Sequence, residues 1–138
     1  MLGTEASATR DASHVSVARL VTYATLRELT SSSYSVGLRH VARLADGQEI
    51  LLLDDRGFSV GSISPGIILT REQVELDART CVGPGEPVDQ QTWTQVEAQH
   101  ATFIAERLRL AGVTIDADEV SHLEHDVVLD ERLRAAVA

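Results

Sequence analysis

The stretch YSVGLRHVARLADGQEILLLDDRGFSV, residues 34–60, contains two apolar runs on either side of Asp46-Gly47. Asp-Gly between alternating runs is the strongest short signal for a β-hairpin, because a two-residue type I′ turn needs positive φ at both central positions. A second turn is predicted at residues 54–57, Asp-Asp-Arg-Gly, where the chain enters a third strand. The fold is therefore expected to be built around an antiparallel meander.

A type I′ turn also predicts the register of the hairpin. Opposed residues share a face of the sheet, and the predicted pairs are Ala45 with Gln48, Ala42 with Leu51, Val41 with Leu52, His40 with Leu53, and Arg39 with Asp54. The expected core face carries Leu38, His40, Ala42, Leu44, Leu51 and Leu53. The opposite face is mixed and includes an expected ion pair between Arg39 and Asp54, so we expect solvent or only partial cover there.

The residues before this hairpin are less clearly patterned. Residues 1–13 are small and polar with no apolar period, which predicts a disordered tail. Residues 14–25 carry several Val and Thr that favour a strand, although Val17, Leu20, Val21 and Ala24 would also form one helical stripe. We favour a strand that pairs with the one starting at Tyr34.

Helices are predicted in the second half. Thr70 followed by Gln73 is a capping-box pattern, and Gly83-Pro84 ends that helix, whose inward stripe is Val74, Ala78, Cys81 and Val82. A longer helix is capped by Asp89 or Thr92 and ended by Gly112, with an apolar sector of Trp93, Val96, Ile104, Leu108 and Ala111. Asp116 is expected to cap a helical turn, residues 126–129 a strand, and Asp130 a last helix.

These elements predict one α+β domain over residues 14–138: a three- or four-stranded antiparallel meander with two main helices on one face. Strands followed by helices argue against a parallel βαβ design. The length and the 43% apolar content are enough for a core without disulfides. A single cysteine, no long apolar run and no signal-peptide pattern predict a cytoplasmic protein.

The charge is uneven along the chain. Residues 1–69 hold seven acidic residues and six arginines, whereas residues 70–138 hold fourteen acidic residues and six arginines. Such an acidic helical half disfavours nucleic acids and anionic membranes as partners and is compatible with a basic protein partner. The acidic residues expected to form the partner-binding face are Glu72, Glu75, Asp77, Glu106, Asp118 and Glu119.

One polar cluster could form a site. Glu97 and His100 are neighbours at i,i+3 and fall with Arg107 inside the apolar sector of the long helix. His122 and His125 have the spacing at which two imidazoles can bind one divalent metal. The candidate metal ligands are therefore Glu97, His100, His122 and His125, although no Cys pair or His-Glu-x-x-His motif accompanies them.

Other catalytic chemistry lacks its usual motifs. No glycine-rich phosphate loop and no glycine-flanked serine occurs, and Cys81 falls on an inward helical stripe. The arrangement is similar to that of many small acidic bacterial proteins, some of which are immunity proteins or toxin inhibitors. The first hypothesis is thus a non-catalytic interaction protein of this kind without a cofactor. The alternative is a divalent-metal-dependent enzyme or small-ligand binder built on the His/Glu cluster.

Overall fold

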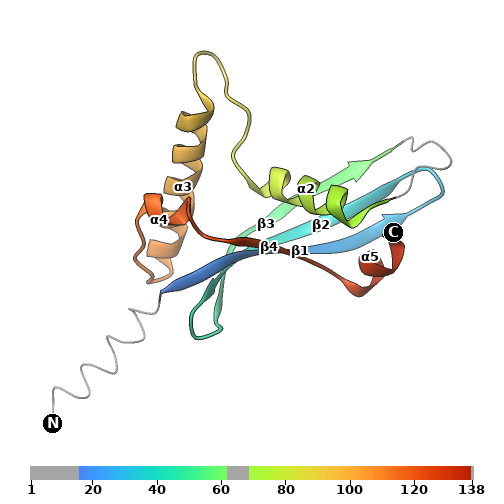
Figure 1. Cartoon of the computed structure of the whole chain (residues 1–138), viewed down its shortest axis with the longest axis horizontal. Helices are drawn as coiled ribbons and strands as arrows, with labels where there is room; N and C mark the ends of the chain where they lie inside the picture. Colours follow the sequence, from blue (N-terminus) through green and yellow to red (C-terminus); the bar gives the residue numbers. More distant parts are fainter. Residues whose placement is uncertain (1–15, 62–68, 138) are drawn as a thin grey trace, which may run out of the picture.

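The computed structural model describes residues 16–61 and 69–137. Within these residues, four strands and four helices follow the order β1, β2, β3, α2, α3, α4, β4, α5 (Figure 1). Their bounds are β1 Val17–Leu29, β2 Tyr34–Leu44, β3 Glu49–Val60, α2 Arg71–Val82, α3 Trp93–Leu110, α4 Ala117–Val120, β4 His125–Leu129 and α5 Glu131–Ala136. The predicted tail, residues 1–13, lies outside the described residues.

The four strands form one sheet in the order β3-β2-β1-β4. Strands β1, β2 and β3 are the predicted antiparallel meander, and β1 confirms a strand for residues 17–25. Strand β4 runs parallel to β1, with Tyr23 beside Val128. The α+β class is therefore confirmed, and the mostly antiparallel sheet contains one parallel pair, β1 with β4. After β3 the chain crosses the sheet through the helices and returns beside β1 in the same direction.

The hairpin turn differs from the predicted type I′ turn. Gly47 has φ +94°, but Asp46 does not have positive φ, and Leu44 N donates to Gln48 O at 2.8 Å. The loop therefore has three residues and ends in a left-handed glycine. Asp46 Oδ1 accepts from Gln48 N at 3.0 Å, which stabilises the turn locally.

The longer loop shifts the register by one residue near the turn. Ala42 pairs with Ile50 and not with Leu51, whereas His40 does pair with Leu53 as predicted. The extra residue of the resulting bulge is Leu52. Because a one-residue shift reverses the facing of side chains, Leu51 is 37% exposed and Leu52 only 1% exposed.

The predicted turn at residues 54–57 was also wrong. Strand β3 continues through these residues to Val60, and Leu38 pairs with Arg56. A second irregularity in the ladder places Arg39 opposite this stretch. No Arg39–Asp54 ion pair forms among the described residues, because the local register is no longer the one that aligned the two side chains.

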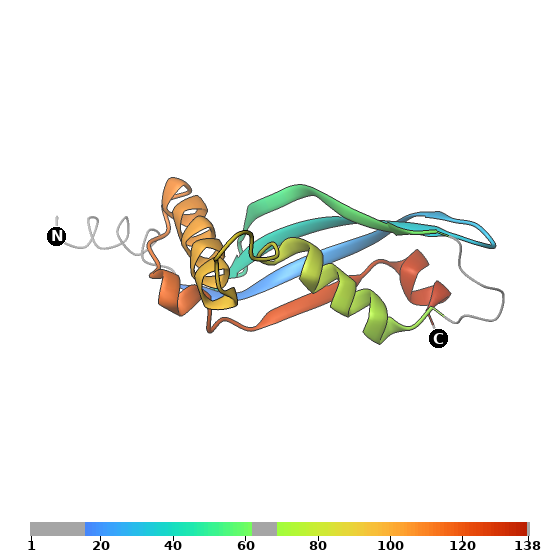
Figure 2. The same ribbon diagram turned by 90° about the horizontal axis from the view of Figure 1, so that it is seen from above.

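The core lies on one face of the sheet. Alternate residues of β2 share that face: Tyr34, Val36 and Leu38 pack with α2 and α5, while Ala42 and Leu44 pack with α3 and α4. Both long helices therefore cover the same face, α2 along one half of the sheet and α3 across its other end (Figure 2). The opposite face is mixed, as predicted, and carries an Arg19–Asp126 ion pair of 2.6 Å.

The helix ends follow the predicted caps in part. Thr70 Oγ1 accepts from Gln73 N at 3.2 Å, but Gln73 turns to Asp77 instead of completing the capping box. Gly83 ends α2 with an ordinary negative φ, whereas Gly112 has the left-handed φ of +92° after α3. Asp130 caps α5, but Asp116 makes no side-chain cap.

Two apolar residues assigned to the buried sector of α3 are exposed, Trp93 and Ala111. Cys81 is half-buried, and its thiol donates to Gly57 O at 3.3 Å. In the described ranges, no helix is long and apolar enough to cross a membrane.

Candidate functional site

A cavity of about 250 Å³ opens where the sheet meets the end of α2, helix α3 and helix α4. Its polar wall residues come from four elements and from the residue that follows α4: His40, Arg79, Glu97, His100, His125 and Ser121. The rest of the wall is mainly aliphatic, with Leu20, Val82, Ile104, Val120 and Leu123. A mainly apolar cavity with a few convergent polar groups is the usual form of a small-ligand site.

Thr22 connects two of these histidines. Its hydroxyl lies 2.8 Å from His40 Nδ1 and 2.6 Å from His125 Nε2, and the two imidazole rings are 5.0 Å apart. A hydroxyl has one proton to donate. If Thr22 donates to one imidazole, the other imidazole must donate its own N–H to Thr22. The tautomers of the two neutral histidines are therefore coupled.

The environment keeps these imidazoles neutral. Burial, followed by the nearby His125, lowers the pKa of His40 from 6.5 to about 3. Burial, followed by the positive charge of Arg79, lowers the pKa of His125 to about 4. Burial and Arg56 also lower the pKa of His100. At neutral pH the three side chains thus offer hydrogen-bond donors and acceptors and no charge.

The second nitrogen of His40 is not used by the contact with Thr22. His40 is 1% exposed, and its Nε2 has no hydrogen-bond partner among the described residues. In this same part of the chain, every side-chain nitrogen or oxygen that is fully sealed from solvent has a partner. His40 also belongs to the cavity wall, so its imidazole borders the space that a guest would occupy. A buried imidazole thus keeps one free nitrogen for a guest.

The structure brings together three of the four predicted metal ligands. Glu97, His100 and His125 line the cavity, whereas His122 lies apart from it and donates through Nδ1 to Asp118 O at 2.7 Å. Within residues 16–61 and 69–137, no three His, Cys, Asp or Glu side chains have an arrangement that could hold a metal ion.

Sequence reasoning missed His40, Thr22 and Arg79 as members of this site. His40 was correctly placed on the core face of its strand, and a histidine on an apolar face was the available signal. The long-range contact of Thr22 with His125 depends on the parallel pairing of β4 with β1, which the sequence did not predict.

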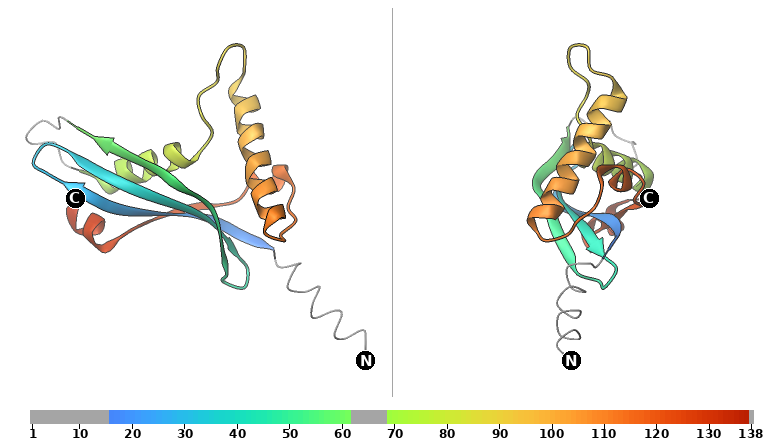
Figure 3. Two further views of the ribbon diagram at one scale, coloured as in Figure 1. Left: turned by 180° about the vertical axis from the view of Figure 1, so that it is seen from behind. Right: turned by 90° about the vertical axis from the view of Figure 1, so that its left-hand side faces the viewer.

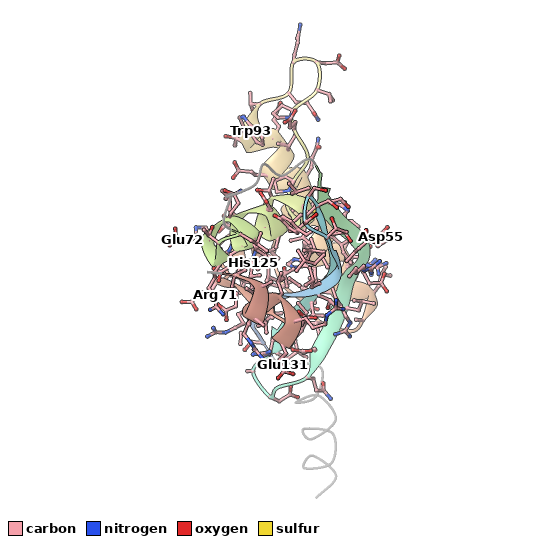
Figure 4. All side chains as sticks on the ribbon, turned by 90° about the vertical axis from the view of Figure 1, so that its right-hand side faces the viewer. Asp55, Arg71, Glu72, Trp93, His125 and Glu131 are labelled. Carbon is pink, nitrogen blue, oxygen red and sulfur yellow. The ribbon has the colours of Figure 1, made fainter. Side chains whose placement is uncertain are left out.

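The six predicted partner-binding acids do not form one continuous unpaired surface. Glu72, Glu75 and Asp77 belong to α2, where Glu75 lies 3.9 Å from Arg71 and 3.8 Å from Arg79. Glu106 on α3 pairs with Arg109. Asp118 and Glu119 are exposed on α4. Arg71 and Glu72 both lie on the outer side of α2 (Figure 4), and the ion pairs of Glu75 balance part of the negative charge of this helix.

A different surface projects from the molecule. The loop after α2 and the first two turns of α3, residues 83–100, extend beyond the sheet (Figures 1 and 3) and are called the α2–α3 arm below. Trp93 is 56% exposed and Val88 is 62% exposed in this arm. The arm holds three acidic residues, Glu86, Asp89 and Glu97, and no Arg or Lys.

The chain matches no known family model, no curated protein and no solved structure.

Proposed function

We propose that this protein is an interaction protein that binds a basic partner protein through the α2–α3 arm. The observation that carries the proposal is Trp93, a large aromatic side chain that is more than half exposed on a projecting part of the fold. Tryptophan is the residue most enriched among the side chains that dominate protein–protein binding energy. Large exposed apolar side chains that gather on one feature mark such surfaces.

The arm is held in shape by its own hydrogen bonds. Thr92 and Gln95 form a complete capping box, with Gln95 N to Thr92 Oγ1 at 3.1 Å and Thr92 N to Gln95 Oε1 at 2.8 Å. Gln91 N donates to Val88 O at 3.1 Å, and Asp89 takes a left-handed φ of 54° that turns the loop back. A surface that is already ordered loses less conformational freedom on binding.

Charge supports a basic partner. The arm carries three carboxylates and, within its own residues, no Arg or Lys. Long-range attraction to such a charge speeds the encounter with a positive protein and weakens as salt screens it, over about 10 Å at 0.1 M and about 3 Å at 1 M. An inhibitor or immunity-type protein that covers the functional surface of a basic toxin is the form of partner binding we favour.

The proposal is tested by affinity capture with matched variants. The full chain is immobilised as wild type, as Trp93→Ala and as Leu110→Ala, and extract of the cells that produce it is passed over each. Leu110 is 68% exposed at the other end of α3 and is the control for loss of an exposed apolar side chain. A partner held by wild type and Leu110→Ala, lost by Trp93→Ala and shown by mass spectrometry to be basic would support the proposal.

The same partner then tests the charge. Association rates are measured in low and high salt for wild type, for an arm variant with Glu86→Gln and Asp89→Asn, and for a variant with Asp118→Asn and Glu119→Gln. The arm variant should associate more slowly at low salt, with the difference reduced at high salt. An equal effect of the α4 variant would indicate that the partner contacts Asp118 and Glu119 as well as the arm. A partner whose binding ignores Trp93 and both charge variants would contradict the proposal.

A further inference from the structure

We propose that the histidine cavity binds a free α-amino acid with an apolar side chain, such as leucine. Its carboxylate is bound by Arg79, its ammonium group by Glu97 and His40, and its side chain by the aliphatic part of the wall. The cavity lies at the base of the α2–α3 arm and shares Glu97 with it, but amino-acid binding is measured without the partner and does not depend on the function proposed above.

The charges around the opening match a zwitterion. Arg79 and Glu97 both line the cavity and are both exposed to solvent, so they stand where it opens. Arg79 is held there by a hydrogen bond to the carbonyl oxygen of His125 at 3.2 Å and lies 3.8 Å from Glu75. Glu97 makes no hydrogen bond or ion pair within the described residues. One cation and one free carboxylate suit a ligand with both charges better than a simple anion or cation.

The size of the cavity suits a small metabolite. Its 250 Å³ is well above the roughly 10–15 Å³ that one water molecule requires, and just below the range of about 300–1,000 Å³ of drug-sized ligand pockets. The inner wall, with Leu20, Val82, Ile104 and Val120, would exclude water from an aliphatic side chain. A strongly polar side chain would leave its polar groups unpaired against these residues.

His40 is a buried polar side chain in the cavity wall, and a bound ammonium group would give its Nε2 a hydrogen-bond partner. An ammonium group has three N–H donors and can donate to Nε2 of His40 as well as to Glu97. For Nε2 to accept, the proton of His40 must be on Nδ1, where it is donated to Thr22. Thr22 must then donate to Nε2 of His125, which places the proton of His125 on Nδ1. Binding thus selects one of the two coupled tautomers.

The first experiment is isothermal titration calorimetry of the full chain with L-leucine, with leucinamide, which lacks the carboxylate, and with 4-methylpentanoate, which lacks the ammonium group. Leucine should bind, and each analogue should bind roughly tenfold or more weakly, because each loses a hydrogen-bonded charge. Arg79→Gln and Glu97→Gln should each weaken leucine binding to a similar extent. Arg71→Gln is the matched control, because Arg71 contacts the same Glu75 but lies outside the cavity.

The second experiment follows the histidine tautomers by ¹⁵N NMR. Addition of L-leucine should move His40 and His125 together to the Nδ1–H form, and Thr22→Val, checked by circular dichroism to be folded, should uncouple the two shifts. Absence of heat with leucine, equal binding of leucine and both analogues, or the same loss of binding in Arg71→Gln as in Arg79→Gln would overturn the proposal. Leucine binding that leaves the signals of His40 unchanged would also contradict it. The partner-binding proposal is untouched by any of these results.

Discussion

Replacement of Thr22 by valine should destabilise the protein by about 2–3 kcal/mol, because a buried polar atom left without its partner costs about 1–3 kcal/mol and each lost hydrogen bond about 0.5–1.5 kcal/mol. Valine keeps the branched shape and the strand preference of threonine, so packing and backbone preference change little. The hydroxyl is lost from both His40, at 2.8 Å, and His125, at 2.6 Å. His40 bears most of the effect, since it is the more deeply buried of the two.

Urea unfolding followed by circular dichroism measures this change as a lower transition midpoint with an unchanged slope. Thr25→Val is the matched control, because Thr25 lies on the same strand but is exposed. A double-mutant cycle with His40→Phe should show strong non-additivity, because the hydroxyl and the imidazole then disappear together. A Thr22→Val variant as stable as Thr25→Val, or strictly additive energies in the cycle, would refute the idea that Thr22 stabilises the histidine pair.

Three further results are expected. Because the folded pKa values of His40 and His125 lie near 3 and 4, below the 6.5 of the unfolded chain, the unfolded state binds more protons as pH falls below 6.5. Stability should therefore drop by about 1.4 kcal/mol per pH unit for each histidine, and urea titrations from pH 7 to about 5.5, where ordinary carboxylates are still almost fully ionised, should show a shallower slope in His40→Phe. Gly47→Val should cost about 1–3 kcal/mol through strain at its φ of +94°, whereas Gly85→Val, at a position without positive φ or close neighbours, should cost much less in the same assay. Thr70→Ala should cost about 1 kcal/mol by leaving a first-turn amide of α2 unpaired; thermal unfolding unchanged from wild type would contradict that cap.

Local patterns in the sequence determined most of the secondary structure. The strand at residues 17–25, the hairpin of β2 and β3, the cap of α2 at Thr70 and the end of α3 before Gly112 all depend on residues close together in the chain. The i,i+3 spacing of Glu97 and His100 was visible for the same reason, and both line the cavity. Periodicity and capping express the geometry of one helix or strand, which is why the sequence alone predicts them.

The register of β3 and the contact between His125 and Thr22 were decided only by the tertiary structure. The bulge at Leu52 reverses which leucine is buried, and it results from a three-residue turn where Asp-Gly favours two. The parallel pairing of β4 with β1 joins segments about a hundred residues apart, and it alone brings His125 to Thr22. Such contacts depend on which surfaces remain free after the meander and helices have packed, a property of the assembled fold that no local pattern in the sequence carries.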